Sequence, residues 1–363
     1  MRFALFYHSV VSDWNHGNAH FLRGLMRALN RRGHDTVCYE PRDAWSLQHL
    51  LEESPSAIAD FDRRFPDLAY ERYDSGPGFE SWLRARLAKT DVAIVHEWND
   101  PAVVRLVARV CGELGVRSLF HDTHYRVVLD AAHRRQLDLP AFDAILAYSP
   151  SVADRHREFG HPRVHVLHEA ADTTVFGPRD VPKRDDVVFV GNLGEEDRRD
   201  GVSSWLFGPR RQLPELRYAI YGVRYPEALL ASMRNGLNID YRGRLPNADV
   251  PEAYSAAKVV LHIPRGPYVE QLPGTPTIRV FEALVSGACL VSSPWQDTDH
   301  LFNAGRDYVL ASSPDEMRDK IAWLVKDAGA RAEFGKRGRE AILARHTCDH
   351  RAAELLEILQ CAS

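Results

Sequence analysis

Short apolar runs of strand length alternate with amphipathic stretches along the first half of the chain. The apolar runs cover residues 2–10, 35–40, 91–98, 116–124 and 142–149. Residues 20–33 instead repeat apolar side chains at helical spacing and end at Gly33, and residues 101–115 show the same pattern. This spacing predicts helices that each bury one face. In the first of them that face consists of Phe21, Leu22, Leu25, Met26 and Leu29.

The same alternation restarts in the second half. Apolar runs cover residues 186–194, 216–223, 239–245, 258–266 and 288–295, with a shorter one at 308–313. We expect helices between them, including 250–257 and 314–328, and one long amphipathic helix over 338–360. Strand–helix alternation with strands rich in Val, Ile and Leu predicts parallel sheets covered on both faces.

Two segments interrupt this rhythm. Residues 41–80 are acidic, aromatic and punctuated by Pro and Gly, and we expect a helix plus a loop insertion there. Residues 169–186 carry Gly, Pro and many charges without periodicity, which is typical of a linker. A chain of 363 residues has room for two domains. The sequence therefore predicts an α/β protein with two Rossmann-like domains, residues 1–170 and 171–339, facing each other across a cleft.

Composition narrows the class of protein. The formal net charge of −4 argues against a globally basic surface for nucleic acid. The five cysteines have no CxxC spacing, so we expect neither a disulfide framework nor a zinc site. The N-terminus is too polar for a signal peptide, and no apolar run reaches the ~18 residues of a membrane span. These features lead us to expect a cytoplasmic protein.

The loops that follow the strands are the first candidates for chemistry, because open α/β sheets bind ligands at that edge. Residues 12–21 follow the first strand and open the first helix. Gly17 permits close backbone approach, and Asn18 tolerates turn geometry. His20 falls on the first helical turn, where it is a candidate general base or a packing residue.

In the second half, residues 190–199 form a glycine turn after a strand. The glycine spacing fits neither the dinucleotide fingerprint nor the Walker motif. Backbone amides of the turn together with Arg198 and Arg199 could still hold a phosphate. The alternative is a solvated loop in which the charges of residues 195–200 pair among themselves.

Residues 274–295 join a Thr/Pro-rich turn to an apolar helix that carries one carboxylate, Glu282. Thr275 and Thr277 could cap a helix that begins near Ile278, and such a helix start attracts anions. A carboxylate on an apolar helix needs a partner. A pair of ligand hydroxyls, as on a ribose, would satisfy Glu282, and so would Arg279.

Polar residues also end two strands of the first half. His121, Asp122 and His124 end one strand, and residues 96–100 end another. Thirteen of the 17 histidines lie in the first 168 residues. This asymmetry indicates proton chemistry or a polar binding site. A metal site and ordinary strand-end polarity are the alternatives, although no HExxH pattern is present.

The order of these motifs resembles glycosyltransferases of the GT-B fold. The matching segments are 20–35, 188–198, 218–222, 241–245, 251–265, 279–295 and 306–317. Segments 17–35 and 147–160 are most similar to the CgeB-like (spore maturation protein) branch, near glycosyltransferase family 4. The resemblance implies an enzyme that moves a sugar from a nucleoside-diphosphate sugar, with UDP as the expected nucleotide, to an acceptor hydroxyl. It also implies that the last helix, about 340–363, returns to the first domain.

The resemblance assigns the donor to the second domain. The diphosphate would meet Thr275, Thr277 and Ile278 with Arg198 or Arg199, beside Gly191, Asn192 and Arg279. Glu282 would bind the ribose, and the backbone at Arg244 and Leu245 would meet the base. The acceptor would lie in the first domain near Asn15, Gly17, Asn18 and His96, with His20, Asp122 and His124 as catalytic candidates.

The chain departs from family 4 at one position. That family usually carries a second Glu eight residues before the ribose-binding one, where this chain has Gly274, and Glu270 is four residues too early. We expect no metal, since a helix dipole and arginines can stabilise the leaving diphosphate. Asp297 and Asp299 form an Asp-x-Asp that we interpret as a turn. We favour a retaining reaction, and an inverting one would need a base such as His20 or Asp122.

Three alternatives remain open from the sequence. An epimerase on the same scaffold would also bind a nucleotide sugar but would need no acceptor. A catalytically silent nucleotide-sugar-binding module would explain the missing Glu at the Gly274 position. A nucleic-acid acceptor is disfavoured by the net charge, although a local basic cleft around Arg210 and Arg211 would allow one.

Overall fold

The computed structural model describes residues 1–194 and 196–361, with side chains over 1–194 and 198–360. These residues form two compact units. The first unit comprises Met1–His168 and the segment that begins at Cys348, and the second comprises Glu169–Thr347. Each unit is built on one parallel sheet, as the strand–helix alternation predicts.

The first unit contains a seven-stranded sheet in the order β3-β2-β1-β4-β5-β6-β7. Its strands are β1 Arg2–Phe6, β2 Asp35–Pro41, β3 Tyr70–Tyr73, β4 Val92–His96, β5 Arg117–Asp122, β6 Ala144–Ala147 and β7 Val164–Val166. The strand order reverses between β1 and β4. In such sheets the carboxyl ends of the two strands at the reversal open a crevice that receives ligands.

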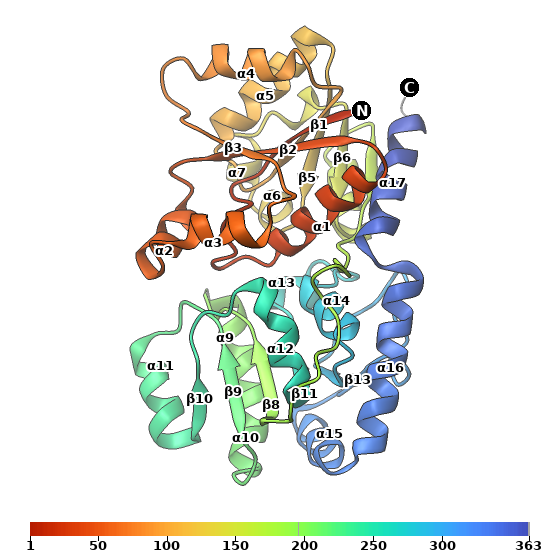
Figure 1. Ribbon diagram of the computed structural model, residues 1–363. Coiled ribbons are helices and arrows are strands. Elements are labelled where there is room, and N and C mark those ends of the chain that lie inside the picture. The colour runs from red at the N-terminus through yellow and green to blue at the C-terminus, as the bar shows by residue number, and fades with distance from the viewer. Residues whose placement is uncertain (195, 362–363) are drawn as a thin grey trace. The chain divides into compact units, whose positions relative to one another are not determined.

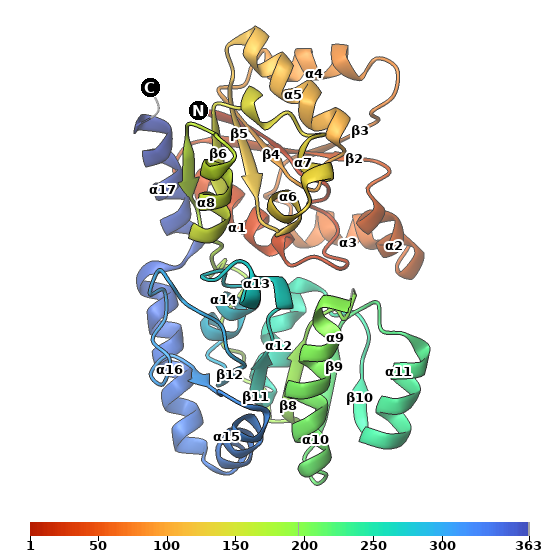
Figure 2. The ribbon, with the colours of Figure 1, turned by 180° about the vertical axis from the view of Figure 1, so that it is seen from behind.

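Helices cover both faces of this sheet, because right-handed crossovers in opposite directions place helices on opposite sides. They are α1 Asn18–Arg31, α2 Trp45–Glu53, α3 Ala57–Arg64, α4 Phe79–Leu87, α5 Pro101–Leu114, α6 Arg126–Leu129, α7 Ala131–Arg134, the 3₁₀ turn Leu139–Ala141, α8 Pro150–Glu158 and α17 Cys348–Cys361. Figures 1 and 2 show α1 packed beside α17, and α4 packed beside α5.

Two strands of this sheet were not predicted. β3 lies inside the segment 41–80, where we expected only a helix and a loop, and it pairs with the edge of β2. Its sequence, YERY, is half exposed and lacks an apolar run, because an edge strand covers only one neighbour. β7 has only three residues and pairs with β6.

The second unit contains a six-stranded sheet in the order β10-β9-β8-β11-β12-β13. Its strands are β8 Asp185–Val190, β9 Tyr218–Tyr221, β10 Ile239–Tyr241, β11 Ala257–His262, β12 Leu290–Ser292 and β13 Val309–Leu310. The order reverses between β8 and β11. The loops after these two strands therefore occupy the ligand-binding edge of this sheet.

The helices of the second unit pack on a core of buried aliphatic and aromatic side chains, among them Val187, Ile220, Val259 and Met317. They are α9 Glu196–Val202, the π-helical turn Ser203–Phe207, α10 Gly208–Gln212, α11 Glu227–Ser232, the π-helical turn Met233–Leu237, the 3₁₀ turn Asn247–Asp249, α12 Val250–Ser255, α13 Gly266–Glu270, α14 Ile278–Val285, α15 Pro314–Lys326 and α16 Ala328–Arg345.

The predicted single helix over residues 338–360 is wrong. The chain forms α16 and α17, and it leaves helical geometry at His346, where φ is −130°. The imidazole Nε2 of His346 lies 3.0 Å from the carbonyl oxygen of Leu301, and the carbonyl of His346 accepts the backbone N–H of Ala171 at 2.9 Å. These tertiary contacts replace the helical ones, and the chain passes from one unit to the other directly after them.

The predicted linker, 169–186, is only partly an exposed connection. Residues Glu169–Asp172 are buried within the second unit, and Ala171 bridges to Thr347. Of the two arginines suggested for a basic cleft, Arg210 is not available to a nucleic acid. Arg210 is 2% exposed and donates to the carbonyls of Leu213 and Asn238, so its charge serves the fold.

Candidate functional site

Polar side chains of the first unit gather where β1, β4 and β5 end. β4 and β5 pair in register so that His96 lies opposite His121, and β1 is followed directly by Tyr7 and His8. The Tyr7 hydroxyl lies 2.7 Å from Nδ1 of His121, and the Tyr7 ring stacks on His96 at 4.6 Å. The three strand ends therefore form one continuous polar and aromatic cluster at the reversal of strand order.

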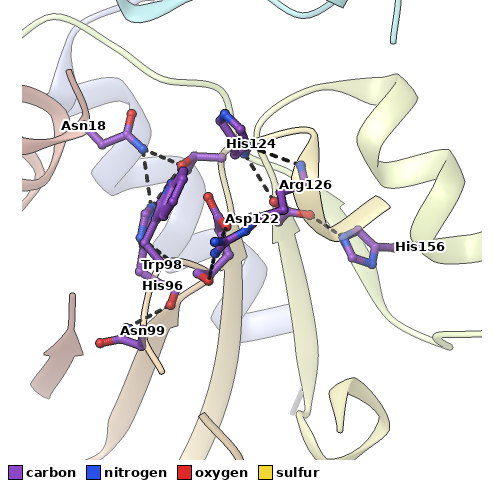
Figure 3. Close-up of polar contacts among 10 residues, drawn as sticks. Asn18, His96, Trp98, Asn99, Asp122, His124, Arg126 and His156 are labelled. Carbon is purple, nitrogen blue, oxygen red and sulfur yellow. Dashed lines mark hydrogen bonds and ion pairs between the residues drawn. The ribbon is translucent and has the colours of Figure 1, made fainter. Parts of the chain in front are cut away.

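His96 is held in a defined orientation (Figure 3). Its Nδ1 accepts the backbone N–H of Trp98 at 3.4 Å. Its Nε2 lies 2.9 Å from the hydroxyl of Thr123 and 3.4 Å from the side-chain nitrogen of Asn18. The side-chain amide of Asn18 donates to the same hydroxyl at 2.5 Å. Burial, reinforced by His121 and His8, lowers the pKa of His96 well below its usual range, so the ring is neutral at physiological pH.

Asp122 is completely buried, and both of its carboxylate oxygens are engaged. Oδ2 lies 2.7 Å from Nε2 of His156, and Oδ1 accepts the backbone N–H of His124 at 3.2 Å (Figure 3). A carboxylate bound in this way orients its neighbours. The geometry therefore favours a positioning role for Asp122 over that of a base.

A second carboxyl, Glu97, lies beside Asp122 and was not singled out from the sequence. It is fully buried, and its Oε2 lies 3.3 Å from the guanidinium of Arg126. Burial, with a further contribution from Asp122, raises the pKa of Glu97 well above its usual range. Arg126 also covers one face of the Trp98 ring at 4.1 Å, and His124 contacts the same ring at its edge.

The predicted loop 12–21 lies at this same edge. Asn15 adopts a left-handed backbone with φ of 58°, Gly17 precedes α1, and Asn18 is the first residue of α1. His20 lies in the first turn of α1 and is 3% exposed. The structure thus brings Asn18, His96, Asp122 and His124 into one region, with Asn15 and Gly17 in the preceding turn.

A group of aromatic side chains surrounds His8 at the same sheet edge, and it was not predicted from the sequence. His8 is 3% exposed, and neither of its ring nitrogens has a hydrogen-bond partner among the described residues. Its ring lies parallel to Trp45 at 6.2 Å and contacts Trp98 and His16. Trp45 is 36% exposed and begins α2, inside the segment 41–80. Such an aromatic site with convergent polar groups is typical of ligand binding.

The glycine turn of the second unit follows β8 at the second reversal of strand order. Asn192 fixes the turn, because its side-chain oxygen accepts the backbone N–H of Val223 at 2.9 Å. Arg198 is 8% exposed and donates to the carbonyl of Asn192 at 3.0 Å. Arg199 is exposed on α9. Residue 195 and the side chains of 196 and 197, part of the alternative in which loop charges pair among themselves, lie outside the described residues.

Two further arginines approach this turn. Gly194 has φ of 58°, and a Cβ at that position would lie 3.7 Å from the guanidinium of Arg224 and 3.8 Å from that of Arg265. Neither arginine was recognised in the sequence, because each belongs to a different strand-end loop. Gly191, Asn192 and Gly194 therefore form a turn lined by Arg198, Arg224 and Arg265, a charge arrangement suited to a phosphate group.

The loop that carries Arg244 and Leu245 adjoins this turn. The backbone N–H of Gly191 donates to the carbonyl of Tyr221 at 2.9 Å, and the N–H of Gly222 donates to Gly243 at 2.8 Å. These bonds connect the ends of β8, β9 and β10. Arg244 and Leu245 are half-buried directly after Gly243.

Helix α14 begins at Ile278, as predicted, but Thr277 does not cap it in the expected way. Thr277 occupies the cap position without a side-chain cap bond. Its hydroxyl lies 3.0 Å from Nε2 of His262, whose Nδ1 lies 2.8 Å from the hydroxyl of Ser292. Burial lowers the pKa of His262 to about 3, so this histidine is neutral. Thr275 is also buried, in the turn before the helix.

Glu282 lies one turn inside α14 and has no exposed surface. Its Oε2 accepts from the guanidinium of Arg279 at 2.5 Å. The simpler of the two partners considered for Glu282 is therefore present. Asp297 accepts the backbone N–H groups of Leu301 and Phe302, which identifies the Asp-x-Asp segment as a turn. The described residues contain no group of three or more potential metal ligands.

Comparison with known proteins places two glycosyltransferase regions on this chain. Residues 17–175 match the model described as Glycosyltransferase Family 4, and residues 198–357 match the model described as Glycosyl transferase-like. The chain is a glycosyltransferase of the GT-B fold. The family 4 resemblance is thus supported in the first half and a glycosyltransferase-like resemblance in the second, while no curated protein sequence matches the chain.

Several solved structures share the fold of this glycosyltransferase. Anabaena HepE in complex with UDP and glucose superposes with a TM-score of 0.73 at 14% identity, covering 99% of both chains. Sucrose-phosphate synthase from Thermosynechococcus elongatus gives a TM-score of 0.70 at 17% identity, covering 100% of both chains. An alpha-glucosyltransferase in complex with UDP and a 13-mer DNA gives 0.69 at 12% identity, covering 99% of both chains. No helix in the described part of our chain is long and apolar enough to cross a membrane.

Proposed function

We propose that this glycosyltransferase transfers a sugar from a UDP-sugar to an acceptor hydroxyl, without a metal and with retention of configuration. The observation that carries the donor assignment is the turn at Gly191–Gly194 with Arg198, Arg224 and Arg265 around it. It lies at the reversal of strand order, together with His262 at the end of β11. HepE and the DNA-bound alpha-glucosyltransferase, which share the fold, both hold UDP.

The arginines supply what departure of the diphosphate requires. Negative charge develops on the leaving oxygen during transfer, and fixed guanidinium groups stabilise it without reorganisation. Arg198 is anchored on the turn through the carbonyl of Asn192. Because these groups can perform the task of a divalent cation, we propose that the reaction does not depend on one.

We propose that the acceptor binds in the first unit, near Asn18, His96 and the aromatic group around His8. His96 and His121 are both neutral at physiological pH, because burial lowers the pKa of His96 well below its usual range and that of His121 to about 3. Such weakly basic imidazoles are poor general bases but good hydrogen-bond partners for a hydroxyl. This supports a retaining reaction, in which the acceptor is oriented rather than strongly deprotonated.

Two finer assignments belong to the same proposal. Segments 17–35 and 147–160 support a place near the CgeB-like branch. Cys38, Cys111, Cys289 and Cys348 are buried and form no disulfide among the residues whose side chains are described, which supports a reducing compartment such as the cytoplasm.

The experiment that tests the proposal incubates the enzyme with UDP-glucose, EDTA and a set of acceptors that includes simple glycosides, glycans and DNA carrying a hydroxymethylated base. Release of UDP that depends on one acceptor, with a product of retained anomeric configuration, would support it. Conversion of the sugar without any acceptor would indicate the epimerase. UDP binding without turnover under any condition would indicate a silent binding module.

A further inference from the structure

The backbone at Gly274 leaves no room for the carboxylate that family 4 usually carries there. Gly274 has φ of 81°, and a Cβ at that position would lie 2.0 Å from the hydroxyl oxygen of Thr298. Its backbone N–H donates to the carbonyl of Gln296 at 2.9 Å, which holds the two segments together. The absence of Glu at this position is therefore built into the packing before α14.

Another carboxyl group reaches the amino end of α14 from a different part of the chain. Glu169, the first residue of the second unit, is 3% exposed and accepts a hydrogen bond from the backbone N–H of Ile278. It also lies close enough to Arg279 and Glu282 for both charges to act on it. Glu169 thus lies at the amino end of α14, where an anionic ligand was predicted from the sequence.

One oxygen of Glu169 is unexplained by this packing. Oε1 is buried and has no hydrogen-bond partner among the described residues. A carboxyl that served only as a helix cap would use one oxygen and would leave the other in water or on a second donor. Here the second oxygen is enclosed without either. An unpaired buried polar atom beside a helix start indicates a ligand group that completes it.

We propose that Glu169 binds hydroxyl groups of the donor's sugar, in place of the carboxylate that family 4 carries at the position of Gly274. This inference rests on the proposed function, since it places the sugar of the UDP-sugar at the amino end of α14. The ligand class is a pyranose with at least one free hydroxyl directed at Glu169. Ile278 holds one oxygen of Glu169 in place, and the sugar hydroxyl bonds to Oε1.

The charge state of Glu169 suits this position. Burial, reinforced by Glu282, raises the pKa of Glu169 to about 8, so the carboxyl is mostly protonated at neutral pH. A neutral carboxyl does not repel the diphosphate that adjoins the sugar, and it can both donate to and accept from a hydroxyl.

The test measures affinities of the full-length protein for UDP and for UDP-glucose by titration calorimetry. The variants are Glu169→Ala, the isosteric Glu169→Gln, and the control Glu270→Gln, which changes an exposed Glu on α13. We expect Glu169→Ala to weaken UDP-glucose binding at least tenfold, to leave UDP binding within twofold, and to behave differently from the control. Glu169→Gln should show a smaller loss, again confined to UDP-glucose.

An unchanged ratio of the two affinities in both Glu169 variants would overturn the inference, because a purely structural cap affects UDP and UDP-glucose alike. Equal weakening of both ligands in Glu169→Gln, which keeps the fold, would also overturn it. Failure of the wild-type protein to bind UDP at all would instead overturn the proposed function, and this inference with it.

Discussion

The buried carboxyl of Glu169 gives the protein a specific dependence of stability on pH. Its pKa is raised from 4.5 to about 8 in the folded state, with burial as the main cause. A group whose folded pKa is raised holds its proton more tightly in the folded state than in the unfolded state. Its contribution to stability is therefore complete below about pH 4.5 and is lost as the pH rises to about 8.

The size of this effect follows from the two pKa values. A difference of about 3.5 pH units at about 1.4 kcal/mol per unit corresponds to roughly 5 kcal/mol between pH 4.5 and 8. For a domain of this size, 1 kcal/mol moves the melting temperature by roughly 2–4 °C. The side chain introduced by Glu169→Gln cannot ionise. The melting temperature of this variant relative to that of the wild type should therefore rise by about 3–5 °C per pH unit between pH 5 and 8.

The assay is calorimetric melting of wild type and Glu169→Gln at pH 5, 6, 7 and 8, at constant ionic strength and without nucleotide. The exposed Glu270→Gln serves as the control and should follow the wild type at every pH. A difference between Glu169→Gln and wild type that stays constant from pH 5 to 8 would refute the reasoning, because it would mean that Glu169 has an ordinary pKa.

Three further predictions test other parts of the account. Arg198→Ala should weaken UDP binding at least tenfold, and Arg199→Ala should change it by less than twofold. The reason is that Arg198 contacts the glycine turn through the carbonyl of Asn192, whereas Arg199 is exposed. Equal effects of the two variants in calorimetry would contradict this assignment. Gly274→Ala should lower the melting temperature more than Gly305→Ala does. Both glycines have φ of 81°, but only at Gly274 would the added Cβ meet a neighbour, Thr298. Equal decreases in melting temperature would show that the contact with Thr298 does not matter for stability. His8→Phe should lower the rate of transfer at least tenfold and leave UDP affinity unchanged. The substitution keeps an aromatic ring but removes both ring nitrogens, which could bind the acceptor. An unaltered rate would exclude His8 from the acceptor site.

The fold was predictable from the sequence because its signal is local. Periodicity and composition alone predict apolar strands such as β1 and β4, and they also predict the end of α1 near Gly33. β3 was missed because an edge strand with exposed Tyr, Glu and Arg carries no apolar run. The break between α16 and α17 was missed because His346 is held by Leu301 and Ala171, which lie far away in the sequence.

The candidate site was predictable only in part, for the same physical reason. His96 and Asp122 end strands and Asn18 begins a helix, so their place at the sheet edge could be inferred. Thr277 was expected to cap α14, but its hydroxyl instead contacts His262 at the end of β11. Glu169 could not be recognised, because the signal that distinguishes it is burial beside Ile278, and the sequence around it is typical of a linker.

The most direct test of the central claim is thermal stabilisation of the purified protein by UDP in the presence of EDTA, compared with GDP, dTDP, CMP and ADP. Binding at about 100 times the dissociation constant should add roughly 2.7 kcal/mol of stability. A rise in melting temperature with UDP that persists in EDTA, and is lost in Arg198→Ala, is the predicted result. No shift with UDP, or a shift that EDTA abolishes, would contradict a metal-independent UDP site at the arginine-lined turn.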